Sequence, residues 1–216
     1  MLCRIERRQF WTRMASKHEF FCKNGCQALR AIPLLLVLTY SSAAAAQTAK
    51  EQLQDSIDSI VAVLRTIRGA QDIEANKPRF REILQTRFDF AAMAEKSLGD
   101  RWQELDSKDE FISVFTEFIE ASYMGTLGSY QGEKVVYDTD RVDGQLAEVG
   151  TRVVGGRGKP IEVLYKLHLK NREWMVYDVV IDDVSVILNY QSQFRRVLQK
   201  SSLAELIRML REKTSG

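Results

Sequence analysis

Hydrophobic residues recur every three or four positions through much of the chain, which is the spacing of amphipathic helices. This pattern predicts a helix over 50–68 and a second helix over 77–86, with Pro78 in the first turn of the second one. A short third helix is expected to follow Asp89, whose side chain can cap it, and to end at Gly99.

A fourth helix, over 109–127, is predicted to bury an unusually aromatic stripe. Beyond Gly132 the hydrophobic period changes from 3.6 to 2, which indicates strands. The short links Asp143-Gly144 and Asn171-Arg172 have the turn chemistry of antiparallel hairpins. Four strands are therefore expected, over 134–142, 145–154, 160–170 and 173–182.

Two further amphipathic helices are expected at the C-terminal end, over 187–198 and 203–210. Four helices, one antiparallel sheet and two helices in this order predict an α+β fold, in which helices pack on a four-stranded antiparallel meander. We expect residues 47–216 to form a single domain.

One face of the predicted sheet is apolar, because hydrophobic and polar residues alternate along its strands. The aromatic stripe of helix 109–127 is expected to lie against this face. The inward face of strand 173–182 is ambiguous: Trp174 and Val176 would share one face, Tyr177 and Val179 the other, and both faces are apolar. A core and a cavity have the same hydrophobic pattern, so the sequence leaves both interpretations open.

The first 46 residues differ from the rest of the chain. Seven Arg or Lys and only two Glu accompany an apolar run over 31–38, and the small residues at 44–46 fit a signal-peptidase site. We expect a cleaved signal peptide over 1–46, with Met14 as an alternative start. A membrane anchor is the other interpretation, but the apolar run is well short of the roughly 20 residues that span a bilayer.

Removal of this segment changes the composition. The whole chain has 31 basic and 29 acidic residues and a formal charge of +2; residues 47–216 keep 24 basic and 27 acidic residues, a charge of −3, and no cysteine. This charge gives no reason to expect nucleic-acid binding. The single remaining imidazole, His168, and the lack of cysteine speak against zinc chemistry of the usual kinds, so no metal site is expected.

Motifs of catalysis are weak in this sequence. The segment 155–158, Gly-Gly-Arg-Gly, precedes a strand and lacks the Lys-Ser/Thr of a phosphate-binding loop, so a hairpin turn is favoured. Asp182 and Asp183 are neighbours at a strand end and point to opposite sides, which suits a chain turn better than a paired-carboxylate site. His168 is expected on the polar face of its strand. No catalytic residue is assigned.

Two segments resemble a known family. Residues 88–102, Phe-Asp-Phe-Ala-Ala-Met-Ala-Glu-Lys-Ser-Leu-Gly-Asp-Arg-Trp, are similar to the F-D-F, M-A, L-G and W signature of the periplasmic toluene-tolerance proteins. Residues 173–194 resemble that family's W-x-V-Y-D-V, V-S and N-Y-R-x-Q-F segment, with Gln191 in place of the usual basic residue and Asp183 in place of a small one. These proteins are the soluble phospholipid carriers of the Mla lipid-transport system, also called ABC transporter auxiliary components.

The resemblance implies a periplasmic protein that carries phospholipid as cargo, with no catalytic activity and no cofactor. It also implies transient docking to an inner-membrane ABC transporter complex and an outer-membrane lipoprotein complex, in a system that maintains outer-membrane lipid asymmetry. We expect a monomer. A hopanoid cargo, and a small secreted enzyme with a cystatin-like or NTF2-like cavity, are the alternatives.

The carrier hypothesis places an apolar pocket between the sheet and the helices, with the acyl chains inside and the polar head in water. The residues expected to contact lipid are Phe111, Phe115, Phe118, Tyr123, Val135, Tyr137, Val149, Val163, Tyr165, Leu167, Tyr177, Val179, Tyr190 and Phe194.

Overall fold

The computed structural model describes residues 47–127, 130–155 and 159–214, and the expected signal peptide over 1–46 lies outside these ranges. The N-terminal helices are α1 (Ala49–Leu64), α2 (Ala70–Arg87), α3 (Phe90–Leu98), the 3-10 helix η1 (Gly99–Glu104) and α4 (Lys108–Leu127). The strands are β1 (Lys134–Asp143), β2 (Leu146–Val154), β3 (Ile161–Lys170), β4 (Glu173–Ile181) and β5 (Val184–Ser185). The chain continues with α5 (Val186–Leu198) and α6 (Leu203–Thr214). None of the helices in the described ranges combines the length and the hydrophobicity needed to cross a membrane.

The predicted α+β order is confirmed, with a short fifth strand that the sequence pattern did not indicate. The strands pair in the order β1-β2-β3-β4-β5, each antiparallel to its neighbour. Asn171 and Arg172 have φ of 52° and 70°, as a two-residue hairpin turn between twisted strands requires. Asp182 and Asp183 also have positive φ, 45° and 65°, and make the tight turn into β5. Residues 156–158 of the expected β2–β3 turn lie outside the described residues.

The starts of the helices follow from local side-chain chemistry. Thr48 and Glu51 form a reciprocal capping box at α1. Asp89 accepts a hydrogen bond from the backbone N–H of Ala92 at 3.1 Å, which confirms the predicted cap of α3. The prediction for α2 was wrong at its start: the helix begins at Ala70, so Pro78 lies inside it and not in its first turn. The carbonyl that this proline leaves unpaired belongs to an exposed turn, where water can bond to it.

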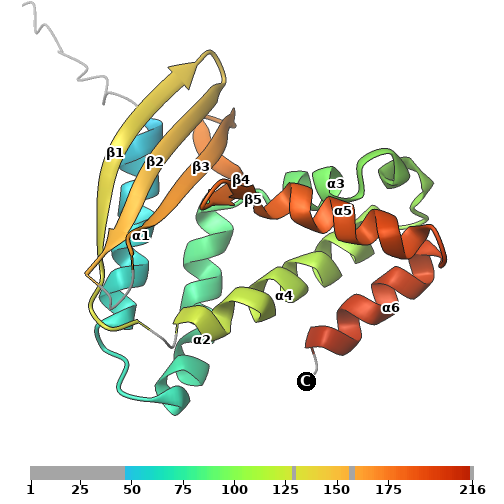
Figure 1. Cartoon of the computed structure of the whole chain (residues 1–216), viewed down its shortest axis with the longest axis horizontal. Helices are drawn as coiled ribbons and strands as arrows, with labels where there is room; N and C mark the ends of the chain where they lie inside the picture. Colours follow the sequence, from blue (N-terminus) through green and yellow to red (C-terminus); the bar gives the residue numbers. More distant parts are fainter. Residues whose placement is uncertain (1–46, 128–129, 156–158, 215–216) are drawn as a thin grey trace, which may run out of the picture. The chain divides into compact units, whose positions relative to one another are not determined.

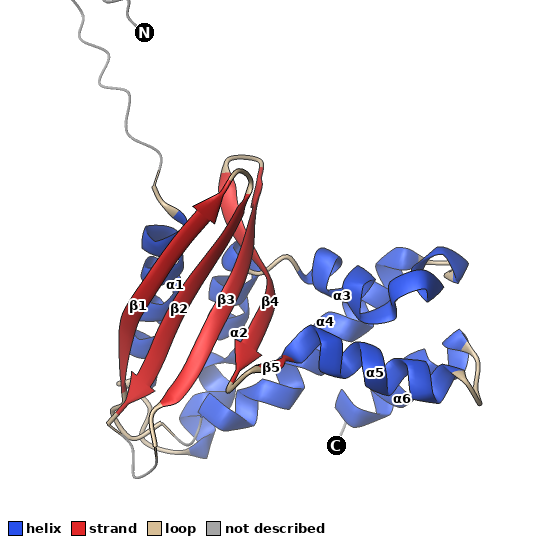
Figure 2. Ribbon diagram, turned by 45° about the horizontal axis from the view of Figure 1, so that its top comes forward, coloured by secondary structure: helices blue, strands red, loops and turns tan. Residues whose placement is uncertain are grey.

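The helices form two groups around the sheet. Figures 1 and 2 show α1 and α2 along one face of the sheet, here called the inner face, while α3 to α6 pack together beyond the β4 edge. The aromatic stripe of α4 does not lie against the sheet as expected. Phe111 and Phe115 instead contact Phe194 of α5, with ring centroids 6.4 and 6.3 Å apart. The aromatic stripe therefore belongs to a core whose buried members come from the helices, with Val179 and Ile181 of β4 packed against it.

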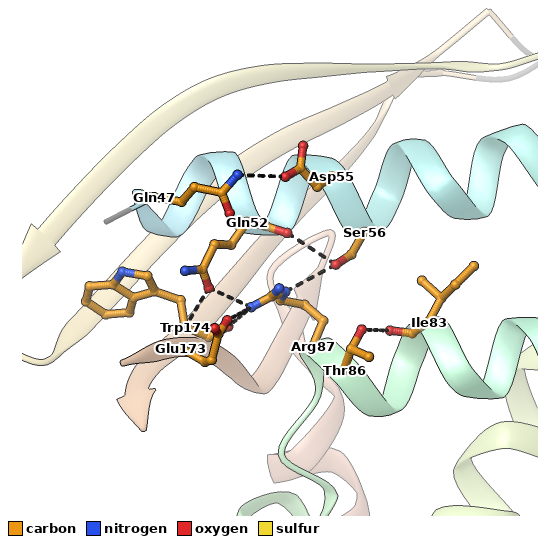
Figure 3. Close-up of polar contacts among 9 residues, drawn as sticks. All are labelled: Gln47, Gln52, Asp55, Ser56, Ile83, Thr86, Arg87, Glu173 and Trp174. Carbon is orange, nitrogen blue, oxygen red and sulfur yellow. Dashed lines mark hydrogen bonds and ion pairs between the residues drawn. The ribbon is translucent and has the colours of Figure 1, made fainter. Parts of the chain in front are cut away.

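A buried arginine ties α1 and α2 to β4 (Figure 3). Arg87, at the end of α2, donates from Nη1 to the side-chain oxygen of Gln52 and to the backbone carbonyl of Trp174, both at 2.7 Å. Its Nε donates to Ser56 of α1 at 3.2 Å, and the carboxylate of Glu173 lies 3.6 Å from Nη1. Because an unpaired buried guanidinium is costly, these contacts fix where the two helices lie on the sheet.

The two segments that resemble the carrier family meet in space. Asp89 and Phe88 pair with Val176, since the Asp89 N–H donates to the Val176 carbonyl at 2.8 Å. Further along, the Gln191 side chain of α5 donates to the carbonyl of Lys96 in α3 at 2.8 Å. The two motifs therefore build the junction between the sheet and the helical group.

Candidate functional site

The inner face changes from a packed core at one end of the sheet to a half-covered surface at the other. Near the β1–β2 and β3–β4 turns, the inward side chains are almost fully buried against Ala49 and Leu53 of α1. Leu167, Val149 and Val176 are each 0% exposed there. This end of the sheet is an ordinary hydrophobic core, and three of its strands contribute to it.

Toward the opposite end of the same face, most of the apolar side chains are only half-buried, although Val163 is buried. The strand register places Tyr137, Val163 and Ile181 in one row across the sheet, and Tyr165 beside Val179 in the next row. At the outermost row, Ile161 is 44% exposed. We call the half-buried apolar residues of this region the inner strip; they are Ile57, Phe88, Tyr137, Tyr165, Val179 and Ile181.

The inner strip lies where two separate hydrophobic clusters approach one another, and a third cluster lies further along α1. One cluster is formed by α3 to α6, the second by α1 with the sheet, and the third by Val63, Leu64 and Phe80 of α1 and α2. Phe88 and Val179 contact both of the first two clusters, yet stay partly exposed. A domain of this size usually has one contiguous core. Here the apolar side chains between the clusters are not fully covered by protein.

A bulge in β4 decides which of its residues face inward. Lys166 pairs with Asp178 and Leu167 with Val176, so Tyr177 has no partner on β3. Strict alternation would place Val176 and Val179 on opposite faces of β4. Because of the bulge, both face inward: Val176 before it and Val179 beyond it. Tyr177 lies on the outer face, with its ring centroid 5.5 Å from that of His168.

The residues expected to contact lipid fall into four groups. Phe111, Phe115, Phe118, Tyr190 and Phe194 lie in the helical cluster, and Tyr123 is 38% exposed at its end. Val149 and Leu167 lie in the packed end of the inner face. Tyr137, Tyr165 and Val179 belong to the inner strip, with Val135 and Val163 on the same face beside them. Tyr177 is on the outer face.

The inner strip contains hydroxyl groups but no charged side chain. Burial raises the pKa of Tyr165 to about 12, so its phenol is neutral at ordinary pH. Burial, followed by the nearby carboxylate of Asp58, also raises the pKa of Tyr137. The Tyr137 hydroxyl is buried and has no hydrogen-bond partner among the described residues. A neutral, mostly apolar surface of this kind suits a ligand made largely of hydrocarbon.

Two surface pockets lie elsewhere and are lined largely by polar residues. One, of about 620 Å³, is lined on the outer face by Lys166, Tyr177 and neighbouring residues of α3 and α5. The other, of about 650 Å³, lies between α2 and α4. Neither of these two pockets is the expected apolar pocket. Its candidate place is the inner strip, where α1 and not α4 packs against the sheet.

Comparison with known proteins gives the family. The model of the MlaC protein family matches residues 54–212. The chain belongs to the MlaC family. It is 24% identical over 127 residues to the intermembrane phospholipid transport system binding protein MlaC of Haemophilus influenzae, a match that covers 56% of this chain and 59% of that protein. The chain thus aligns with about three-fifths of the length of this curated relative.

The fold also matches that of a solved structure. A phospholipid-binding protein from Ralstonia solanacearum, solved in complex with a phospholipid, superimposes with a TM-score of 0.68 at 19% identity, over 78% of this chain and 98% of that one. At this identity the match establishes the shared fold of helices on an antiparallel sheet.

His168, the single histidine of residues 47–216, belongs to an ion-pair cluster on the outer face. Nε2 of His168 lies 3.0 Å from Oδ2 of Asp89, and the ammonium of Lys170 donates to the same oxygen at 2.7 Å. Burial alone would raise the pKa of Asp89, but hydrogen bonds from Lys170, Ala92 and His168 outweigh it and hold the pKa below its usual value. Asp89 also caps α3, so the cluster fastens that helix to the sheet.

Sequence reasoning missed the helix that opposes the inner strip. Ile57 of α1 packs against the sheet cluster there, although the stripe of this helix was recognised as amphipathic. Ile181 was also missed. Its inward position depends on the bulge in β4, which has no signal in the hydrophobic pattern. Within the described ranges, no cluster of three or more His, Cys, Asp or Glu side chains could hold a metal ion.

Proposed function

We propose that this protein is a periplasmic phospholipid carrier and that the acyl chains bind along the inner strip. The observation that carries the proposal is the exposure gradient along one sheet face, from side chains that are 0% exposed to apolar side chains that the protein only half covers. Membership of the MlaC family supports it, since a curated relative is a phospholipid transport binding protein and a protein of the same fold was solved with phospholipid.

The energetics explain why a carrier needs such a surface. Two acyl chains contain roughly 30 methylenes, and exposing each to water costs about 0.8 kcal/mol, so free transfer through water would cost more than about 20 kcal/mol. A bilayer shields the same chains. The carrier therefore needs only to hold the acyl chains about as favourably as the bilayer does. The free energy of exchange between carrier and bilayer is then close to zero.

The proposed lipid site consists of Tyr137, Tyr165, Val179 and Ile181 of the sheet, with Ile57 of α1 opposite them. Val135 and Val163 extend it along the same face, and Phe118, Tyr190 and Tyr123 lie at the adjoining end of the helical cluster. Inside the helical core Phe111 stacks on Phe115, and Phe194 meets both rings edge-to-face, so we assign these three residues a structural role.

We further propose that the protein is exported by cleavage of residues 1–46, works as a monomer, and exchanges lipid with an inner-membrane ABC transporter complex and an outer-membrane lipoprotein complex. The formal charge of −3 on residues 47–216 supports transient docking over tight adsorption to anionic membranes. The system would maintain the lipid asymmetry of the outer membrane.

The test is the lipid content of the native protein. The chain is expressed with its N-terminal segment, isolated from the periplasm, extracted with organic solvent and examined by mass spectrometry. Near-stoichiometric phospholipid is expected. A polycyclic triterpenoid in its place would reassign the cargo to hopanoids, and a protein without any lipid would contradict the carrier function.

A further inference from the structure

The inner strip is closed at one end and open at the other. Its closed end, here called the floor, is formed by Leu53 of α1 with Leu167 and Val176 of the sheet, which are 1%, 0% and 0% exposed. Its open end carries Ile161 of β3, 44% exposed, and Val184 of β5, 57% exposed. Val184 lies directly opposite a residue of the inner strip in β4, so its side chain is on the same face. An acyl chain along the strip therefore has its free end toward the floor and its ester end toward Ile161.

A buried polar network behind the floor makes it a fixed stop (Figure 3). Trp174 follows Val176 toward the closed end of β4, and its backbone carbonyl accepts a hydrogen bond from Nη1 of Arg87 at 2.7 Å. The Trp174 N–H donates to the side-chain oxygen of Gln52 at 2.9 Å. A hydrocarbon chain that pushed past the floor would separate these buried groups without offering them a hydrogen bond. The floor therefore does not retreat to make room for a longer chain.

The distance from the open end to the floor is close to the depth of one bilayer leaflet. Ile161 and Tyr165 are the first and last inward residues of β3 before the floor, and they are four residues apart. At about 3.3 Å per residue, this part of the strand is about 13 Å long. A leaflet contains about 15 Å of hydrocarbon, which is half of a bilayer core about 30 Å thick. The strip therefore covers a chain of ordinary membrane length and ends there.

We propose that the inner strip limits the length of the acyl chains that this protein carries, with Leu53, Leu167 and Val176 as the stop. This inference rests on the proposed carrier function, which places the chains on the inner strip. A chain longer than the strip exposes its extra methylenes to water at the open end, whereas a bilayer shields them. Each extra methylene then lowers the equilibrium transfer from bilayer to protein about fourfold, the factor that corresponds to about 0.8 kcal/mol.

The decisive experiment measures equilibrium transfer of phosphatidylcholines from fluid vesicles to the protein isolated from the periplasm and freed of lipid. The series is dimyristoleoyl, dipalmitoleoyl, dioleoyl, dieicosenoyl and dierucoyl phosphatidylcholine, each with one double bond per chain and in order of increasing length. Transfer is expected to vary by less than about threefold up to the dioleoyl form and to fall at least about tenfold for the next member, which adds two methylenes to each chain.

Two variants are expected to move this limit in opposite directions. Val179→Phe places a larger side chain on the inner face just in front of the floor and should shift the limit to a shorter member of the series. Leu167→Ala removes part of the floor and should raise the transfer of the first excluded member at least about fourfold, the effect of covering one more methylene. Val180→Phe is the matched control, since it adds the same ring on the outer face and should keep the original limit. General damage to the fold does not produce shifts of opposite sign.

The outcomes separate this proposal from the carrier function. Equal transfer of every member of the series would overturn the length limit and leave the carrier function standing. No transfer of any member would contradict both. A limit that stays in place in both Val179→Phe and Leu167→Ala would overturn the assignment of the floor. If neither variant folds, as judged by circular dichroism, the series on the unchanged protein still decides whether the limit exists.

Discussion

Replacing Val179 by aspartate places a carboxylate in the middle of the proposed lipid site. Val179 faces inward, pairs with Tyr165 and contacts both the helical cluster and the sheet cluster. Its chain neighbour Val180 has the same side chain and is also half-buried, but it faces outward and pairs with Leu164. Val180→Asp is therefore a closely matched control, since it removes the same group from the same strand.

The magnitude follows from the cost of placing a carboxylate against acyl chains. The least costly route is to protonate it, and an aspartate with its ordinary pKa of about 3.9 requires about 4 kcal/mol for this at pH 7. Val179→Asp is thus expected to lower phospholipid affinity by up to about 1000-fold, while Val180→Asp lowers it by less than about threefold. Because each pH unit changes the cost by about 1.4 kcal/mol, the affinity of Val179→Asp should recover about tenfold between pH 7 and pH 6.

The assay is transfer of a fluorescent phospholipid from vesicles to lipid-free protein, at several pH values. Val179→Asn, which is polar but does not titrate, should show a smaller loss without the recovery at low pH. Thermal unfolding of all three variants separates lost binding from lost folding. Equal losses in Val179→Asp and Val180→Asp, or a loss in Val179→Asp that does not change with pH, would refute the placement of the acyl chains on the inner strip.

Three further predictions concern stability and can be measured by urea unfolding. Asp89→Asn should lower the free energy of unfolding at pH 7 by about 1 kcal/mol, because it removes the charged acceptor of Lys170 and His168, whose side chains are partly open to water. Since the pKa of Asp89 is lowered in the folded state, this stabilisation is present above the unfolded pKa of 3.8 and is lost as the pH falls through the folded pKa. A difference that persists at pH 2 would contradict the assignment. Gly150→Ala should destabilise by about 1–3 kcal/mol, since the added Cβ would lie 2.3 Å from Oγ1 of Thr139, and adding Thr139→Ala should restore most of the loss; no rescue would mean that the clash lies elsewhere. Tyr137→Phe removes a buried hydroxyl that has no hydrogen-bond partner among the described residues, and should leave stability unchanged or raise it by about 1 kcal/mol. A loss of that size would reveal a hydrogen bond of this hydroxyl.

Local chemistry in the sequence determined much of the architecture. The periods of 3.6 and 2 identified the order of helices and strands, and Asp89 was recognised as the cap of α3 from its position alone. The hairpin at Asn171-Arg172 was likewise predicted from its turn residues. These features depend on residues within a few positions of one another, so the chain specifies them before any long-range contact forms.

Long-range packing decided the candidate site. Which element covers the apolar sheet face depends on contacts between distant segments, and the structure places α1 there, held by the contacts of Arg87, while the aromatic stripe of α4 packs on α5. The bulge beside Tyr177 reversed the facing of the second half of β4. The hydrophobic pattern shows which side chains avoid water, whereas only the packed structure shows where the protein leaves them half covered.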